Sequence, residues 1–65
     1  MRNENLIRVR TKIGLTQVEV AKKANITERA YQNYEAGRKP KVDVAIRIAD
    51  VLGIKSYQDF KKIFN

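Results

Sequence analysis

The chain has 65 residues, 43% hydrophobic and 32% charged, which is enough for one small globular domain and too short for two. It contains no histidine and no cysteine, which excludes disulfides, zinc-finger sites and Ser-His or Cys-His nucleophiles. Its 14 lysines and arginines against 7 acidic residues give a formal net charge of +7, which favours a polyanionic partner, nucleic acid ahead of an anionic membrane.

Membrane and nucleotide-binding signals are missing from the sequence. The longest apolar run is Val44–Ile46, far short of the roughly 20 residues of a membrane span. The polar residues 1–4 lack the apolar stretch of a signal peptide, so a cytoplasmic location is expected by default. Gly14, Gly37 and Gly53 lie too far apart for a nucleotide-binding loop. We therefore expect no enzyme activity, no metal, no cofactor and no small-molecule ligand.

Capping and breaking residues predict two helices in the first part of the chain. The first helix covers about residues 3–13 and ends at Gly14. Thr16 and Glu19 form the T-x-x-E capping box of the second helix, which ends near Ala24.

A third helix follows the second after a very short turn. Asn25 suits the left-handed conformation that closes a helix, and Thr27 is the cap of a helix over about residues 28–36, which Gly37 ends. Two short helices joined in this way are typical of a helix-turn-helix motif, here about residues 17–36. Two ordinary helices of a bundle are the structural alternative.

Two further helices are predicted after a basic connector at residues 38–41, whose proline interrupts the helix. The fourth covers residues 42–52, and the fifth covers residues 57–64 after a weaker cap at Ser56. The apolar face expected for the fourth helix consists of Val42, Ala45, Ile46, Ile48, Ala49 and Leu52.

Three segments resemble the phage repressor and Cro (Xre-type) family: LTQVEVA at 15–21, YEAGRKP at 34–40 and IADVLGI at 48–54. The resemblance covers nearly the whole chain at matching spacing. It implies an all-α, compact five-helix, lambda-repressor-like DNA-binding domain over residues 1–65, with the third helix entering the major groove.

The sequence departs from the family pattern at three positions. Asn25 stands where members usually have glycine, and it tolerates the left-handed turn. Tyr31 stands where members have a branched aliphatic residue, and we expect its hydroxyl at the surface. Lys41 replaces a capping serine or threonine, so the fourth helix should begin less sharply.

The resemblance also implies roles for individual residues. Arg29 suits a bidentate contact with guanine, Gln32 or Asn33 could pair with adenine, and Glu28 could accept from cytosine or orient Arg29. A solvated helix face is the alternative for this group. The expected base contacts are Glu28, Arg29, Gln32 and Asn33; the expected backbone contacts are Gln17, Thr27, Arg38, Lys39 and Lys41; and Arg10 with Glu35 is the expected structural ion pair.

One short recognition helix covers only a few base pairs, so we predict a weak homodimer on a palindromic operator. The fifth helix carries more apolar side chains than one face can bury, and two valines of the fourth helix are predicted to lie opposite its core face. The interface residues expected on this basis are Tyr57, Phe60, Ile63, Phe64, Val44 and Val51.

The function that the sequence favours is a sequence-specific, double-stranded DNA-binding transcriptional regulator of the small phage or mobile-element repressor type. A protein-interaction module on the same fold, such as an antitoxin or adaptor, is the alternative. An RNA or membrane-surface binder ranks last, because only the net charge supports it.

Overall fold

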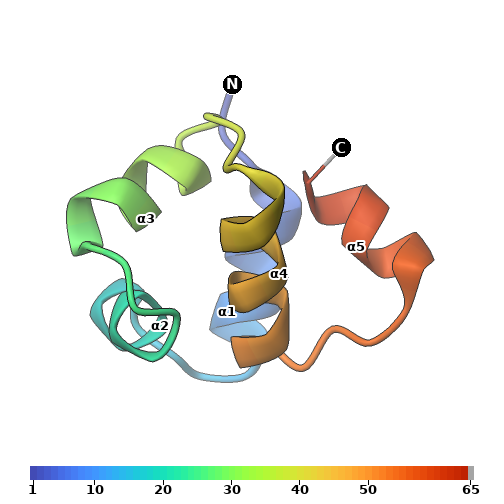
Figure 1. Ribbon diagram of the computed structural model, residues 1–65, viewed down its shortest axis with the longest axis horizontal. Helices are drawn as coiled ribbons and strands as arrows, with labels where there is room; N and C mark the ends of the chain where they lie inside the picture. Colours follow the sequence, from blue (N-terminus) through green and yellow to red (C-terminus); the bar gives the residue numbers. More distant parts are fainter. Residues whose placement is uncertain (65) are drawn as a thin grey trace.

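The computed structural model describes residues 1–64, and these form five helices and no strand. The helices are α1 (Glu4–Lys12), α2 (Gln17–Lys23), α3 (Glu28–Glu35), α4 (Val42–Val51) and α5 (Tyr57–Phe64). In Figure 1, α4 crosses in front of α1 at the centre, with α2 and α3 on one side and α5 on the other. The predicted all-α architecture of five helices is confirmed.

Local capping residues set the helix boundaries, as the sequence predicts. Thr16 forms both bonds of the capping box with Glu19, at 2.8 and 3.1 Å. The Thr27 hydroxyl accepts a hydrogen bond from the backbone N–H of Ala30 at 3.1 Å. Asn25, with φ of 59°, is the left-handed residue of the turn between α2 and α3. The Lys41 side chain makes no hydrogen bond that caps α4, as expected where lysine replaces a capping serine or threonine.

The core is formed by buried side chains from all five helices, and its largest member is Tyr31. Tyr31 has no exposed surface, so the expectation that its hydroxyl reaches solvent is wrong. Its ring points inward from α3 and fills space in the core that a smaller, branched aliphatic side chain would leave empty. The core cluster consists of Leu6, Val20, Ala21, Ala24, Tyr31, Ile48, Leu52 and Ile63.

The buried face of α4 differs from the predicted one at its edges. Val42 and Ile46 are 72% and 55% exposed, although they were expected in the core. Val44 and Val51, expected on the opposite side, are half-buried and pack against the core cluster. Helical periodicity places these two edges at similar distances from the centre of the core stripe. Tertiary packing therefore decides which edge is covered.

Helix α5 buries one of its four apolar side chains almost completely. Ile63 is only 6% exposed and belongs to the core, so its predicted place in a dimer interface is wrong. Phe60 and Phe64 are half-buried, with ring centroids 5.2 Å apart. Tyr57 is 73% exposed. The surface of α5 that is open to a partner is thus centred on Tyr57 and not on Ile63.

Candidate nucleic-acid interface

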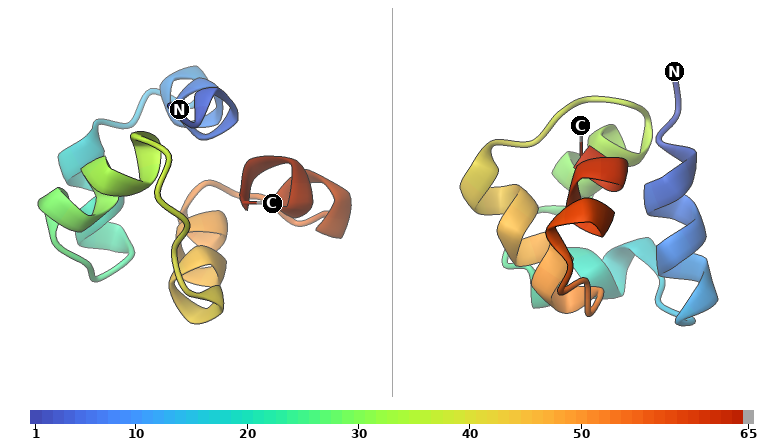
Figure 2. Two further views of the ribbon diagram at one scale, coloured as in Figure 1. Left: turned by 90° about the horizontal axis from the view of Figure 1, so that it is seen from above. Right: turned by 90° about the vertical axis from the view of Figure 1, so that its right-hand side faces the viewer.

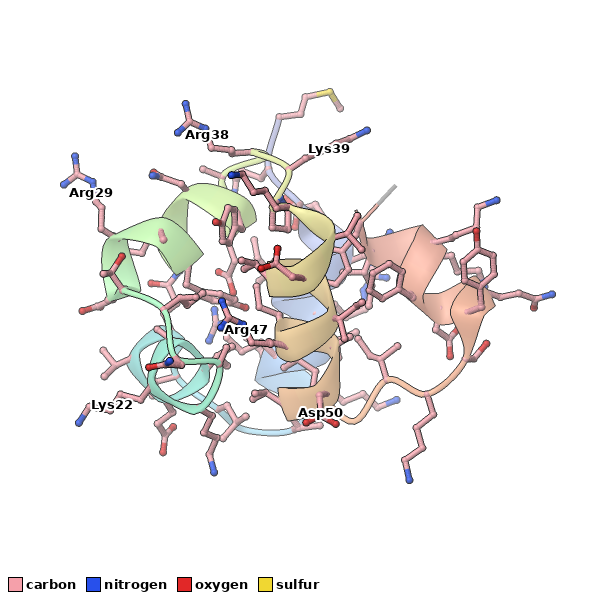
Figure 3. The ribbon with its side chains drawn as sticks, viewed as in Figure 1. Lys22, Arg29, Arg38, Lys39, Arg47 and Asp50 are labelled. Atoms are coloured by element: carbon pink, nitrogen blue, oxygen red, sulfur yellow. The ribbon has the colours of Figure 1, made fainter. Side chains whose placement is uncertain are left out.

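Helix α3 presents one polar face away from the domain. Glu28, Arg29 and Gln32 are exposed and Asn33 is half-buried, while Tyr31 on the inner face is buried. Figure 3 shows Arg29 extending from α3 into solvent. The structure therefore groups the four predicted base-contacting residues on one accessible face.

Glu28 has a partner on this face that the sequence did not suggest. The Gln32 side-chain amide donates to the Glu28 carboxylate at 3.2 Å, one helical turn away. This bond takes the place of the Arg29 contact that was considered for Glu28. The Arg29 guanidinium consequently remains available for a ligand.

The basic connector between α3 and α4 lies directly beside the polar face of α3. Arg38, Lys39 and Lys41 are all exposed, and Figure 3 shows the first two pointing outward at the same edge of the domain as Arg29. The backbone N–H of Arg38 donates to the Asn33 carbonyl at 3.0 Å, which closes the end of α3. The polar face and the cationic connector therefore form one continuous surface.

Gln17 begins α2 and reaches the end of α3. Its half-buried side-chain amide donates to Oε1 of Glu35 at 2.8 Å. The second amide hydrogen and the amide oxygen are not used by this bond. Gln17 therefore joins α2 to α3, while its phosphate contact stays a prediction.

The structure joins Arg10 of α1 to Glu35 of α3 in the expected ion pair. Nε of Arg10 donates to Oε2 of Glu35, and Nη2 donates to Oε1 at 3.2 Å. Nη1 of Arg10 also donates to the Leu15 carbonyl at 2.9 Å. Because Glu35 is only 5% exposed, this bidentate contact compensates a charge that would otherwise be costly to bury.

Two pKa shifts follow from this arrangement. Burial acts to raise the pKa of Glu35, but the hydrogen bonds from Arg10 and Gln17 and the charge of Arg10 outweigh it, so the pKa lies below its ordinary value. Burial raises the pKa of the Tyr31 phenol, and the nearby Glu35 carboxylate raises it further. Glu35 is therefore ionised and Tyr31 neutral near pH 7.

Asn3 is an organising residue that the sequence analysis missed. Its Oδ1 accepts from the Leu6 N–H at 3.0 Å, which caps α1, and its Nδ2 donates to the Ile63 carbonyl at 2.7 Å. Its backbone N–H donates to the Glu35 carbonyl at 2.8 Å. A polar residue before a helix is a capping signal in sequence. Its partners on α3 and α5, however, are far away along the chain.

Within residues 1–64, no cluster of three or more histidine, cysteine, aspartate or glutamate side chains is arranged to hold a metal ion. None of the helices in this part of the chain has the length and apolar character needed to cross a membrane.

The fold and the exposed polar face of α3 define a DNA-binding helix-turn-helix protein. A family model described as Helix-turn-helix matches residues 6–60, and the chain belongs to this Cro/C1-type, Xre-like family. No curated protein and no solved structure matches the chain. Domains of this family bind DNA, and α2 and α3 are two short helices joined by the turn at Asn25.

Proposed function

We propose that this protein is a sequence-specific, double-stranded DNA-binding repressor of the small phage or mobile-element type. The observation that carries the proposal is the exposed polar face of α3 lying beside the cationic connector at 38–41. A helix inserted in the major groove, with the cations of the connector on a flanking phosphate strand, occupies the site. An occupied promoter is closed to other proteins, so repression needs no further surface.

Base reading rests on the outward residues of α3. Arg29 contacts guanine through its free guanidinium, and Gln32 or Asn33 contacts adenine. Glu28, already bonded to Gln32, either holds that amide in place or accepts from cytosine.

Backbone contacts fix the register of α3 on the duplex. Arg38, Lys39 and Lys41 supply cations from the connector, Gln17 offers its unused amide hydrogen, and Thr27 offers its hydroxyl hydrogen while its oxygen caps α3.

Two copies bind a palindromic operator as a weak homodimer. Helix α3 has 8 residues and is about 12 Å long, so one copy reads only a few base pairs. Half-sites one helical turn apart are separated by about 34 Å, which requires each α3 to lie about 17 Å from the two-fold axis. The domain measures 26 × 22 × 21 Å, so two copies in direct contact satisfy this spacing.

The interface that we now propose for the dimer is the groove between α4 and α5. Val42, Ile46 and Tyr57, the most exposed apolar residues of these two helices, line this groove of about 470 Å³ together with Phe60. Asp50 and Lys55 flank it and supply opposite charges that a two-fold axis can pair. This groove replaces the part of the predicted interface that contained Ile63, Val44 and Val51.

The decisive experiment separates base reading from backbone contact. A site is first selected from a random duplex pool, and binding is then measured on that site and on unrelated DNA. We expect Arg29→Ala to lose about 1 to 3 kcal/mol on the selected site and little on unrelated DNA. Lys39→Ala should weaken both alike, because phosphates carry no sequence information.

Salt dependence distinguishes DNA binding from a protein-interaction function. Affinity should fall with a log-log slope of roughly −4 to −8, because a dimer releases several condensed counterions. Absence of binding at micromolar protein and low salt, or binding that is indifferent to salt, would contradict the proposal and favour an interaction module.

A further inference from the structure

A cationic groove adjoins the connector at 38–41, outside helices α2 and α3. The groove, of about 330 Å³, is formed by the amino-terminal segment, the α3–α4 connector and the end of α5. These three segments meet at the upper edge of the domain in Figure 1. Among residues 1–64, four basic side chains, Arg2, Arg38, Lys39 and Lys62, line the groove, and Glu4 is the one acidic side chain that lines it.

Backbone contacts hold the walls of this groove in place. Asn3 ties the amino-terminal segment to the Glu35 and Ile63 carbonyls, at 2.8 and 2.7 Å. Gly37, with φ of 119°, allows a close approach: a Cβ there would overlap the backbone carbonyl of Met1. Figure 2 shows the amino-terminal segment and the connector close together in both views. The cations are therefore carried on a preorganised frame.

The positive charge of the groove is poorly compensated. Glu4 approaches Arg2 at 4.0 Å, but both side chains are about two-thirds exposed (69% and 67%), so water and salt screen the pair. Within residues 1–64, no carboxylate lies within ion-pair distance of Arg38, Lys39 or Lys62. The groove therefore presents a net attraction to an anion.

The end of α5 would normally oppose an anion, because its free carbonyls carry the negative end of the helix dipole. Here two amide side chains donate to two of these carbonyls. Nδ2 of Asn5 donates to the Lys62 carbonyl at 3.1 Å, and Nδ2 of Asn3 donates to the Ile63 carbonyl. These two carbonyls are hydrogen-bonded by residues at the start of α1, which partly compensates the negative end of α5 beside the Lys62 ammonium.

We propose that this groove binds DNA phosphates flanking the bases read by α3, with Arg2 and Lys62 as additional backbone contacts. The inference rests on the proposed DNA binding. Duplex DNA is the favoured anion because two of the four cations, Arg38 and Lys39, belong to the connector that follows α3. The groove continues the same positive surface towards α5, and a polyanion can occupy both.

The test compares two neighbouring lysines of α5. Lys62→Ala removes a groove cation, whereas Lys61→Ala removes an equal charge from an exposed side chain whose ammonium lies 5.7 Å from the Tyr57 ring centroid, outside the groove. Binding is measured on duplexes carrying one selected half-site, so that dimerisation does not contribute. Thermal unfolding of both variants checks that the domain is intact.

We expect Lys62→Ala, and likewise Arg2→Ala, to reduce the salt slope by about 0.9 and to lower affinity roughly fivefold at about 0.1 M salt. Lys61→Ala should have a clearly smaller effect. Shortening the duplex so that it lacks the flanking phosphates should weaken the parent protein more than Lys62→Ala, which has already lost one of the contacts to them.

Equal effects of Lys61→Ala and Lys62→Ala, or an equal loss for parent and Lys62→Ala on the short duplex, would overturn the inference. In that case Lys39→Ala still loses affinity, and the proposed function stands. If the parent protein binds no DNA at all, the proposed function and this inference fall together.

Discussion

At the scale of single residues, Glu35 connects three helices through one carboxylate. It is the last residue of α3, and it accepts hydrogen bonds from Arg10 of α1 and Gln17 of α2. These contacts fix how α3 sits relative to the two helices behind it. The face of α3 that is proposed to read DNA is therefore oriented by a buried charge.

Removing the arginine should be costly for stability. Arg10→Met leaves the Glu35 carboxylate buried with only the Gln17 amide as a partner, and we expect a loss of about 3 to 5 kcal/mol in the free energy of unfolding. Arg8→Met, at an exposed position of the same helix, should change it by less than about 0.5 kcal/mol. Urea denaturation of both variants makes the comparison. Similar losses would show that the ion pair adds nothing beyond an exposed arginine.

Glu35 should also make stability depend on acid pH. Its pKa is lower in the folded protein than in the unfolded chain, so the unfolded chain takes up the proton first as pH falls. The stabilisation is present above the ordinary value of 4.5 and is lost as pH falls below it towards the folded pKa. Urea denaturation between about pH 6 and pH 2 should show a flatter profile for Glu35→Gln than for the parent. Parallel profiles would exclude Glu35 as a source of the acid sensitivity.

At the scale of elements, the sequence predicts those boundaries that adjacent residues determine. The capping box at Thr16 and the left-handed Asn25 act within a few residues, so α2, the turn and α3 were predictable from the chain itself. The covered edge of α4 was not, because Val44 and Ile46 flank the same stripe and only the neighbouring helices distinguish them. The bonds of Asn3 to α3 and α5 could not be predicted either, because their partners, the Glu35 and Ile63 carbonyls, are brought near Asn3 only by the tertiary fold.

Asn3 offers a way to separate the capping of α1 from the attachment of α5. Asn3→Asp keeps an oxygen for the Leu6 N–H but loses the donor to the Ile63 carbonyl, whereas Asn3→Ala loses both. We expect the free energy of unfolding to fall by about 1 kcal/mol more in Asn3→Ala than in Asn3→Asp, because about 1 kcal/mol is the usual value of a helix cap. Amide hydrogen exchange should be faster in α5 for both variants, but faster in the first turn of α1 only for Asn3→Ala. Unchanged exchange in α5 would mean that the bond from Asn3 to the Ile63 carbonyl does not help to hold that helix.

At the scale of the whole molecule, the DNA-reading face of α3 and the α4–α5 groove proposed for the dimer lie on different sides of the domain. Figure 2, viewed from above, shows α3 on one side and α4 with α5 on the other. A partner bound in the α4–α5 groove therefore leaves the DNA-reading face of each copy free. The apolar area is small, so the dimer should be weak in solution and completed on the operator.

Ile46→Glu should abolish cooperative binding to a full operator without unfolding the domain. Ile46 is 55% exposed in the single chain, so the substitution costs little stability, but in a dimer it would place an unpaired carboxylate in the apolar α4–α5 groove. Ile13→Glu is the matched control, because Ile13 is 47% exposed and lies outside this groove. Both substitutions lower the net charge by the same amount. Both variants should therefore lose similar affinity for an isolated half-site, and Ile46→Glu alone should lose cooperativity. Sedimentation velocity and binding isotherms on full and half operators provide the measurement. If Phe64→Glu abolished cooperativity while Ile46→Glu retained it, the two copies would meet at the end of α5 instead.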